Sequence, residues 1–163
     1  MANQEDILKG ALLLEKRGKA LYEASAQGTD SGAVREVFLT LAEEEGRHIE
    51  MLSKAFASLA RTGRLDSAVP TEQPTDVTAR VLTQAVKEEV SAASYEAAAL
   101  YAAMALEERA VAFYSSAAEE TSGEAKALFG WLAQWERSHL DLLTALDQDL
   151  RQKVWNDQKF WPS

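Results

Sequence analysis

The chain has 163 residues, of which 47% are hydrophobic and 26% charged, and its formal net charge is −9. This length suits one domain with a single core. The acidic balance argues against nucleic acid as a partner. The absence of cysteine excludes disulfides, thiolate zinc sites and cysteine-bound iron–sulfur clusters. No segment reaches the roughly 18 consecutive apolar residues of a spanning helix, so we expect a cytoplasmic protein that does not bind membranes.

Glycine and proline divide the chain into four long segments with helical character. These segments cover about residues 4–27, 33–60, 94–120 and 124–150. Between the second and third, the polar segment 61–80 contains Pro70 and Pro74 and is a predicted linker. A short helix is expected within residues 76–90. The tail, residues 151–163, receives no predicted structure.

The lengths of these segments predict two helical hairpins joined by one long connection. A helix of about 25 residues is roughly 37 Å long, a distance that some 20 linker residues can span. The expected fold is therefore all-α, a four-helix bundle with one long crossover, in a single domain over residues 1–150.

The predicted core-facing stripe of each helix is apolar at both ends and polar at its centre. The second and fourth helices each carry Glu-x-x-His there, and the first and third each carry a glutamate followed seven residues later by a tyrosine. The residues concerned are Glu45, His48, Glu136 and His139, then Glu15, Tyr22, Glu107 and Tyr114. The two histidines are the only ones in the chain.

The two halves of the chain repeat each other in this register. His139 follows His48 by 91 positions, as Glu136 follows Glu45, and Glu107 follows Glu15 by 92. The stripe also distinguishes between neighbouring acids: Glu45 lies on it whereas Glu43 and Glu44 do not, and Glu107 lies on it whereas Glu108 does not.

Four carboxylates facing one core region would repel each other and lose their hydration, unless a cation neutralises them. Four ionised glutamates with two neutral histidines carry −4, which two ferrous ions balance. Mixed carboxylate and imidazole ligands favour iron or manganese over calcium or a closed zinc site. The sequence therefore predicts a two-metal site; the alternative is a hydrogen-bonded polar core without metal. The predicted ligands are Glu15, Glu45, His48, Glu107, Glu136 and His139.

Three pairs of residues lie beside the predicted ligands. Tyr22 and Tyr114 either donate hydrogen bonds to a carboxylate of the opposite helix or simply pack in the core. The indoles at positions 131 and 135 are assigned to packing rather than to electron transfer. Gly18 and Ala110 are expected to be small because the bundle must leave room beside the metals.

Over about residues 5–150 these motifs resemble the rubrerythrin branch of the ferritin-like superfamily. The resemblance rests on Glu15…Tyr22, Glu45-Gly-Arg-His48, Glu107…Tyr114 and Glu136-Arg-Ser-His139. It implies a di-iron centre, with iron rather than manganese, that reduces hydrogen peroxide. It also implies a homodimer and electrons from a rubredoxin-type iron site, which this cysteine-free chain would have to obtain from a separate protein.

One position departs from the family pattern. Rubrerythrins carry an additional glutamate three residues after the ligand of the third helix, and Ala110 stands there. The ligand set is consequently more symmetric, as in the ferroxidase centre of bacterioferritin. Three functions stay open: reduction of peroxide or dioxygen, oxidation or storage of iron, and an interaction module stabilised by metal.

Overall fold

Four long helices and one short one form the part of the chain that the computed structural model describes, which is residues 3–65, 69–70, 81–89 and 95–158. They are α1 (Gln4–Gly28), α2 (Gly32–Thr62), α4 (Gln84–Glu89), α5 (Tyr95–Glu120) and α6 (Gly123–Gln158). No strand occurs among these residues. The predicted all-α class is confirmed, and α4 lies within the segment expected to add a short helix.

Side-chain and glycine caps fix where the long helices begin and end. The side chain of Asn3 accepts a hydrogen bond from the amide of Glu5 at the start of α1, and Ser31 does the same for Val34 at the start of α2. Helix α2 ends at Gly63, whose left-handed φ of 70° suits a residue without a side chain.

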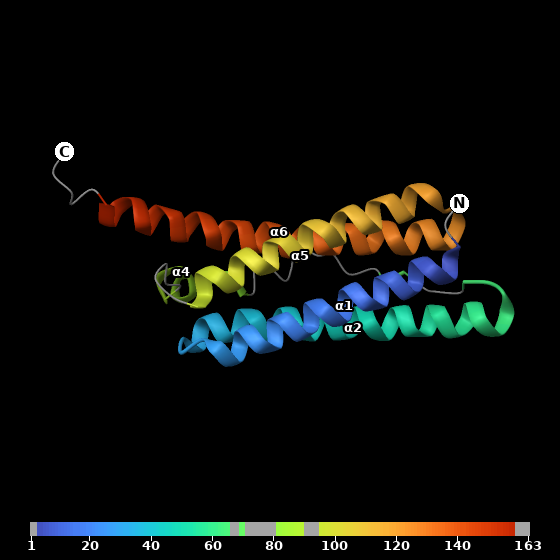
Figure 1. Ribbon diagram of the computed structural model, residues 1–163, viewed down its shortest axis with the longest axis horizontal. Helices are drawn as coiled ribbons and strands as arrows, with labels where there is room; N and C mark the ends of the chain where they lie inside the picture. Colours follow the sequence, from blue (N-terminus) through green and yellow to red (C-terminus); the bar gives the residue numbers. More distant parts are fainter. Residues whose placement is uncertain (1–2, 66–68, 71–80, 90–94, 159–163) are drawn as a thin grey trace.

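The long helices form two hairpins, α1 with α2 and α5 with α6 (Figure 1). The hairpins pack together through α1 and α5, while α4 contacts both α2 and α6. This is the connectivity of a bundle with one crossover between its second and third long helices. None of the described helices is both long and apolar enough to cross a membrane.

Helix α6 is longer than the sequence analysis predicted. It continues eight residues past the expected end at about 150 and projects beyond the rest of the bundle (Figure 1). Arg151 pairs with Asp147 one turn earlier at 2.9 Å, and Lys153 donates to the carbonyl of Glu88 at 2.8 Å. Pro74, most of the predicted linker, and Phe160 and Trp161 of the tail lie outside the described residues.

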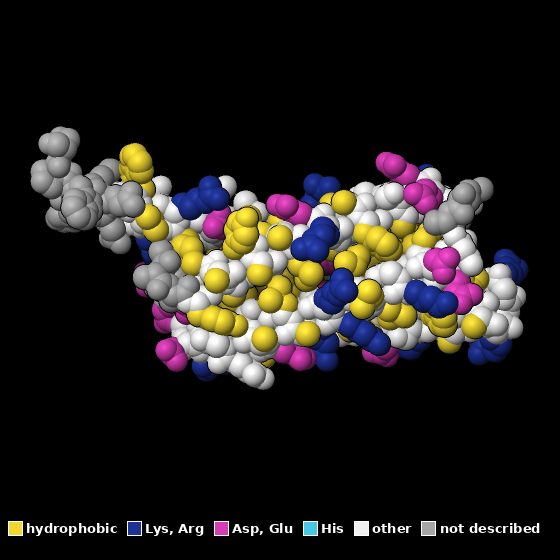
Figure 2. Space-filling view, in the orientation of Figure 1, with side chains coloured by type: hydrophobic (Ala, Val, Ile, Leu, Met, Phe, Trp, Pro, Cys, Tyr) yellow, Lys and Arg dark blue, Asp and Glu magenta, His cyan; other side chains and the backbone are white. Residues whose placement is uncertain are grey.

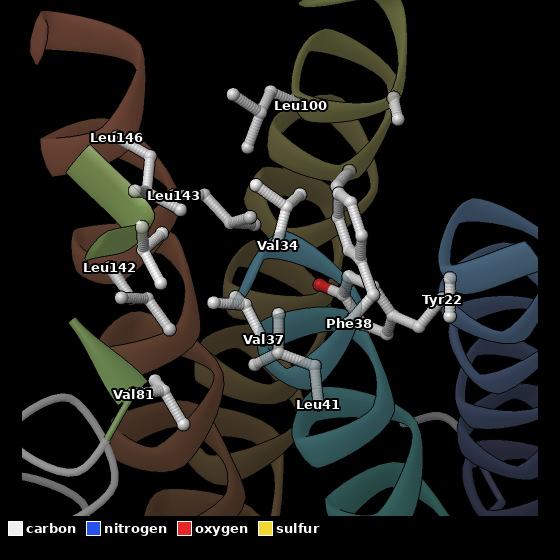
Figure 3. Packing of buried hydrophobic residues seen from close by; sticks show 14 of the residues in the cluster. Tyr22, Val34, Val37, Phe38, Leu41, Val81, Leu100, Leu142, Leu143 and Leu146 are labelled. Carbon is white, nitrogen blue, oxygen red and sulfur yellow. The ribbon is translucent and has the colours of Figure 1, made fainter. Parts of the chain in front are cut away.

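Two apolar clusters fill the bundle, one toward each end. The first includes Tyr22, Phe38 and Leu143, drawn in Figure 3. The second includes Leu8, Leu52 and Phe129 at the opposite end. Because all four helices cross both clusters, the polar positions midway along each helix are held at a fixed height between them.

Candidate metal centre

The six predicted ligands lie together between the two apolar clusters. Helices α1 and α5 contribute one glutamate each, and α2 and α6 contribute one Glu-x-x-His pair each. None of the six residues is more than 2% exposed, and no histidine is visible on the face shown in Figure 2. A spacing of three residues turns both members of each pair to the same side of the helix.

The six side chains form two overlapping groups of candidate ligand atoms. Glu15 and His48 complete one group, and Glu107 and His139 complete the other. Glu45 and Glu136 belong to both groups, and within each group the ligand atoms lie within 4.8 Å of one another. This arrangement suits two neighbouring ions with the two shared carboxylates between them.

Unsatisfied atoms in the second group indicate what the residues are arranged to hold. The Nδ1 atom of His139 is 3.3 Å from an oxygen of Glu45, 3.3 Å from one of Glu107 and 3.2 Å from one of Glu136. It has no hydrogen-bond partner among the described residues. A single N–H could point at only one of three oxygens, whereas a cation would interact with all four atoms.

The first group repeats this pattern. The Nδ1 atom of His48 lies 2.9 Å from Glu136, 3.3 Å from Glu15 and 3.5 Å from Glu45. Oε1 of Glu136 and Oε2 of Glu45 are buried without a hydrogen-bond partner in the described structure. Buried polar atoms are rarely left unpaired, so the donor set fits two divalent cations of the iron or manganese class.

The two tyrosines connect the hairpins through the glutamates of α1 and α5. The Tyr22 hydroxyl donates to Glu107, and the Tyr114 hydroxyl donates to Glu15 at 2.5 Å. Both tyrosines are fully buried. Of the two roles left open by the sequence, the geometry supports the first: each hydroxyl orients a carboxylate on the opposite helix.

Glu44 is a buried site residue that the helical stripe did not identify. The stripe excluded it, yet it is 1% exposed. One of its oxygens lies 2.5 Å from Nε2 of His139 and accepts a hydrogen bond from the indole of Trp135 at 3.0 Å. A carboxylate in this position orients a metal-binding imidazole and directs its other nitrogen to the metal. Trp135 therefore does more than pack.

The comparison with protein families matches residues 6–147 to the family described as Rubrerythrin. The match spans most of the sequence and includes both hairpins. The chain belongs to the rubrerythrin family.

Structural comparison agrees on the fold. A hypothetical protein from Pyrococcus furiosus is 24% identical, and the match covers 92% of this chain and 91% of that one with a TM-score of 0.64. At that identity the likeness concerns the fold alone. No curated protein matches this chain.

Protons take the place of cations in the metal-free rubrerythrin centre. Burial, together with the charges of Glu15 and Glu107, raises the pKa of Glu136 to about 8. Burial and the same kind of repulsion raise the pKa of Glu45 well above its ordinary value. The pKa values of both histidines are also raised well above the ordinary range: burial opposes this, but the surrounding carboxylates outweigh it.

Glu15 differs from the other carboxylates. Burial alone would raise its pKa, but the charge of His48 and the hydrogen bonds with Glu45, His48 and Tyr114 outweigh burial and lower that pKa to about 2. The centre therefore places an ionised glutamate beside protonated groups when no metal is bound.

Gly18 leaves room for a predicted ligand in this rubrerythrin bundle. A Cβ on Gly18 would lie 3.4 Å from the carboxyl carbon of Glu45 and 3.3 Å from Leu106. Ala110 is buried on the facing helix α5. Space beside Glu45 is therefore limited at Gly18, which agrees with the expectation that this residue must be small.

Proposed function

We propose that this chain holds two iron ions among the six buried ligands and uses them to reduce hydrogen peroxide or dioxygen. The observation that carries the proposal is the pair of overlapping ligand groups that share Glu45 and Glu136. Shared carboxylates would hold two ions as neighbours, as in other two-metal sites. Glu45 and Glu136 would then help to hold both ions, and Glu15 and Glu107 would each help to hold one.

The bound iron would supply the electrons: two ferrous ions becoming ferric give two electrons, which with two protons convert one hydrogen peroxide to two waters. The chain's own residues bind the ions, exclude bulk water and orient the ligands through Tyr22, Tyr114 and Glu44. Repeated turnover requires an electron donor, and we propose a separate protein of the rubredoxin type.

A second candidate function is iron oxidation and storage. It is favoured by Ala110, which stands where rubrerythrins carry an additional glutamate. Without that glutamate the centre has one terminal carboxylate on each side, as ferroxidase centres do. Uptake of iron beyond two ions per chain would support this candidate.

The test is to load the metal-free protein anaerobically with two ferrous ions per chain and mix it with either oxidant. We expect rapid formation of the ferric absorbance with peroxide and a slower reaction with dioxygen. Faster oxidation by dioxygen would favour the ferroxidase function. No ferric product with either oxidant would contradict both redox functions and leave a metal-stabilised interaction module.

The variant that tests the site itself is Glu136→Gln, which keeps the side chain's shape and removes one shared carboxylate. It should lose the binding of two ions and the fast oxidation together. Retention of both would contradict the site as assigned.

A further inference from the structure

The six ligands are almost completely buried, so any reactant must reach them through the protein. A cavity of about 170 Å³ borders one ligand, His48. It lies between α2 and α6 and is also lined by Pro70 of the connection between α2 and α4. A water molecule occupies about 30 Å³ of liquid, so the cavity has room for only a few small molecules.

The walls of the cavity are mainly apolar. Trp131 and Trp135 stack with ring centroids 4.7 Å apart, and each meets the His48 ring edge-on at 5.7 and 5.9 Å. Met51, half-buried, forms a further part of the wall. Such a lining favours small uncharged molecules over hydrated ions, because an ion would lose its hydration there.

The charged groups at this cavity also disfavour cations. Arg47, half-exposed at 52%, lies 3.5 Å from the buried carboxylate of Glu44. Trp135 and His139 both contact one oxygen of Glu44, and the guanidinium of Arg47 faces the other oxygen, which has no hydrogen-bond partner among the described residues. The guanidinium toward solvent would repel ferrous iron and leave a neutral molecule unaffected.

The cavity is lined by His48 of the first ligand group but not by His139 of the second. His139 has its Nε2 atom against Glu44, whereas no described residue hydrogen-bonds to Nε2 of His48. The His48 side of the centre is therefore the side on which a small molecule can come next to a ligand.

We propose that this cavity is the entry and binding site for the small uncharged oxidant, hydrogen peroxide or dioxygen, and that it delivers the oxidant to the metal held by His48. This inference rests on the proposed function. It assigns the substrate a route that is separate from the route of the metal ions.

Met51→Trp tests the proposal by filling the cavity while leaving all six predicted ligands in place. We expect ferrous oxidation to slow by at least about tenfold, equivalent to ~1.4 kcal/mol in the barrier, while the rate and stoichiometry of anaerobic ferrous loading stay unchanged. Leu39→Trp is the matched control, because it adds the same ring at a half-exposed position of α2. It should oxidise like the parent protein.

Nitric oxide binding to the anaerobic ferrous protein provides a readout that does not depend on turnover. Nitric oxide is a neutral diatomic molecule, and its association should slow in Met51→Trp by a similar factor. Unchanged association and unchanged oxidation in a correctly folded Met51→Trp protein would overturn the proposal. Slower ferrous loading would overturn it too, because the cavity would then serve the metal.

A second variant covers the case in which the larger side chain prevents folding. Met51→Ala widens the cavity, so the reaction with tert-butyl hydroperoxide should accelerate relative to that with hydrogen peroxide. An unchanged preference would count against the cavity. If the parent protein oxidises with neither oxidant, the proposed function fails, and the nitric oxide rates still decide whether the cavity leads to the centre.

Discussion

The carboxylate of Glu44 orients the imidazole of His139. In the second half of the internal repeat, a tryptophan stands at the position equivalent to Glu44. Trp135 follows Glu44 by 91 positions, the same offset that relates the two Glu-x-x-His pairs. The indole of Trp135 donates to Glu44 rather than accepting from His48. Two equivalent positions of the internal repeat thus cooperate on a single histidine, and the two groups of predicted ligands have different surroundings.

Glu44→Gln should weaken metal binding by about 10–100-fold, the usual effect of removing an outer partner of a metal-bound histidine. The amide keeps the shape but cannot supply the negative charge that supports the imidazole. Affinity can be measured anaerobically by competition with a coloured chelator. Glu43→Gln, at the adjacent exposed position, is the control and should bind like the parent; equal affinities for both variants would remove this role from Glu44.

Metal binding should release protons and become tighter as pH rises. The raised pKa values of Glu136, about 8, and of Glu45 mean that both carry protons in the metal-free protein at neutral pH. A metal must displace these protons, and displacement becomes easier as pH increases until Glu136 ionises unaided. Manganese titrations in two buffers of different ionisation enthalpy would count the protons; zero release at pH 7 would contradict the assigned protonation.

The clustering of the six predicted ligands could be predicted because all lie on stripes that repeat every three or four residues, and because two register-matched copies remove ambiguity. Glu44 could not be found in this way. It lies about 100° around α2 from Glu45, and its burial depends on Trp135 and His139 of another helix. The only sequence signal was the offset of 91 that pairs it with a tryptophan.

Among the helices, α6 contains a glycine whose removal should stabilise the bundle. A Cβ at Gly130 would meet nothing within 4 Å, and glycine inside a helix costs roughly 0.5–1 kcal/mol relative to alanine. Gly130→Ala should therefore raise the free energy of unfolding by about that amount in urea titrations. Metal binding should not change.

Gly18→Ala is the contrasting substitution on α1. The same gain in helix propensity is opposed by contact with Leu106 and with the carboxyl group of Glu45. We expect little or no gain in stability and weaker metal binding than in Gly130→Ala. Equal behaviour of the two variants would show that the space beside Glu45 is not restricted.

Helix ends were predicted well where glycine or a capping side chain fixes them and less well elsewhere. The start of α2 and the turn before α6 have such signals at Ser31 and Gly123. The segment 151–158 has neither glycine nor proline, and α6 simply continues through it. Its expected end at about 150 followed the end of the apolar stripe, which reports burial and not helix formation.

For the whole molecule, metal binding should raise stability. Two cations would neutralise a cluster of buried carboxylates that otherwise depends on protons, and the unfolded chain has no such cluster. Metal in 100-fold excess over its dissociation constant contributes about 2.7 kcal/mol per site. The thermal midpoint should therefore fall when a chelator removes the metal, and Glu136→Gln should show no such shift.

The ring of His139 is held by Glu44, whereas the ring of His48 has no equivalent carboxylate on its Nε2 atom among the described residues. A clamped ligand loses less conformational freedom on coordination than an unclamped one, so the position at His139 should bind first and release last. Loading with one equivalent should then give mostly half-filled molecules rather than a mixture of empty and full ones. Chains that duplicate internally are free to diverge at single positions, and here that divergence would make a dinuclear centre assemble in a defined order.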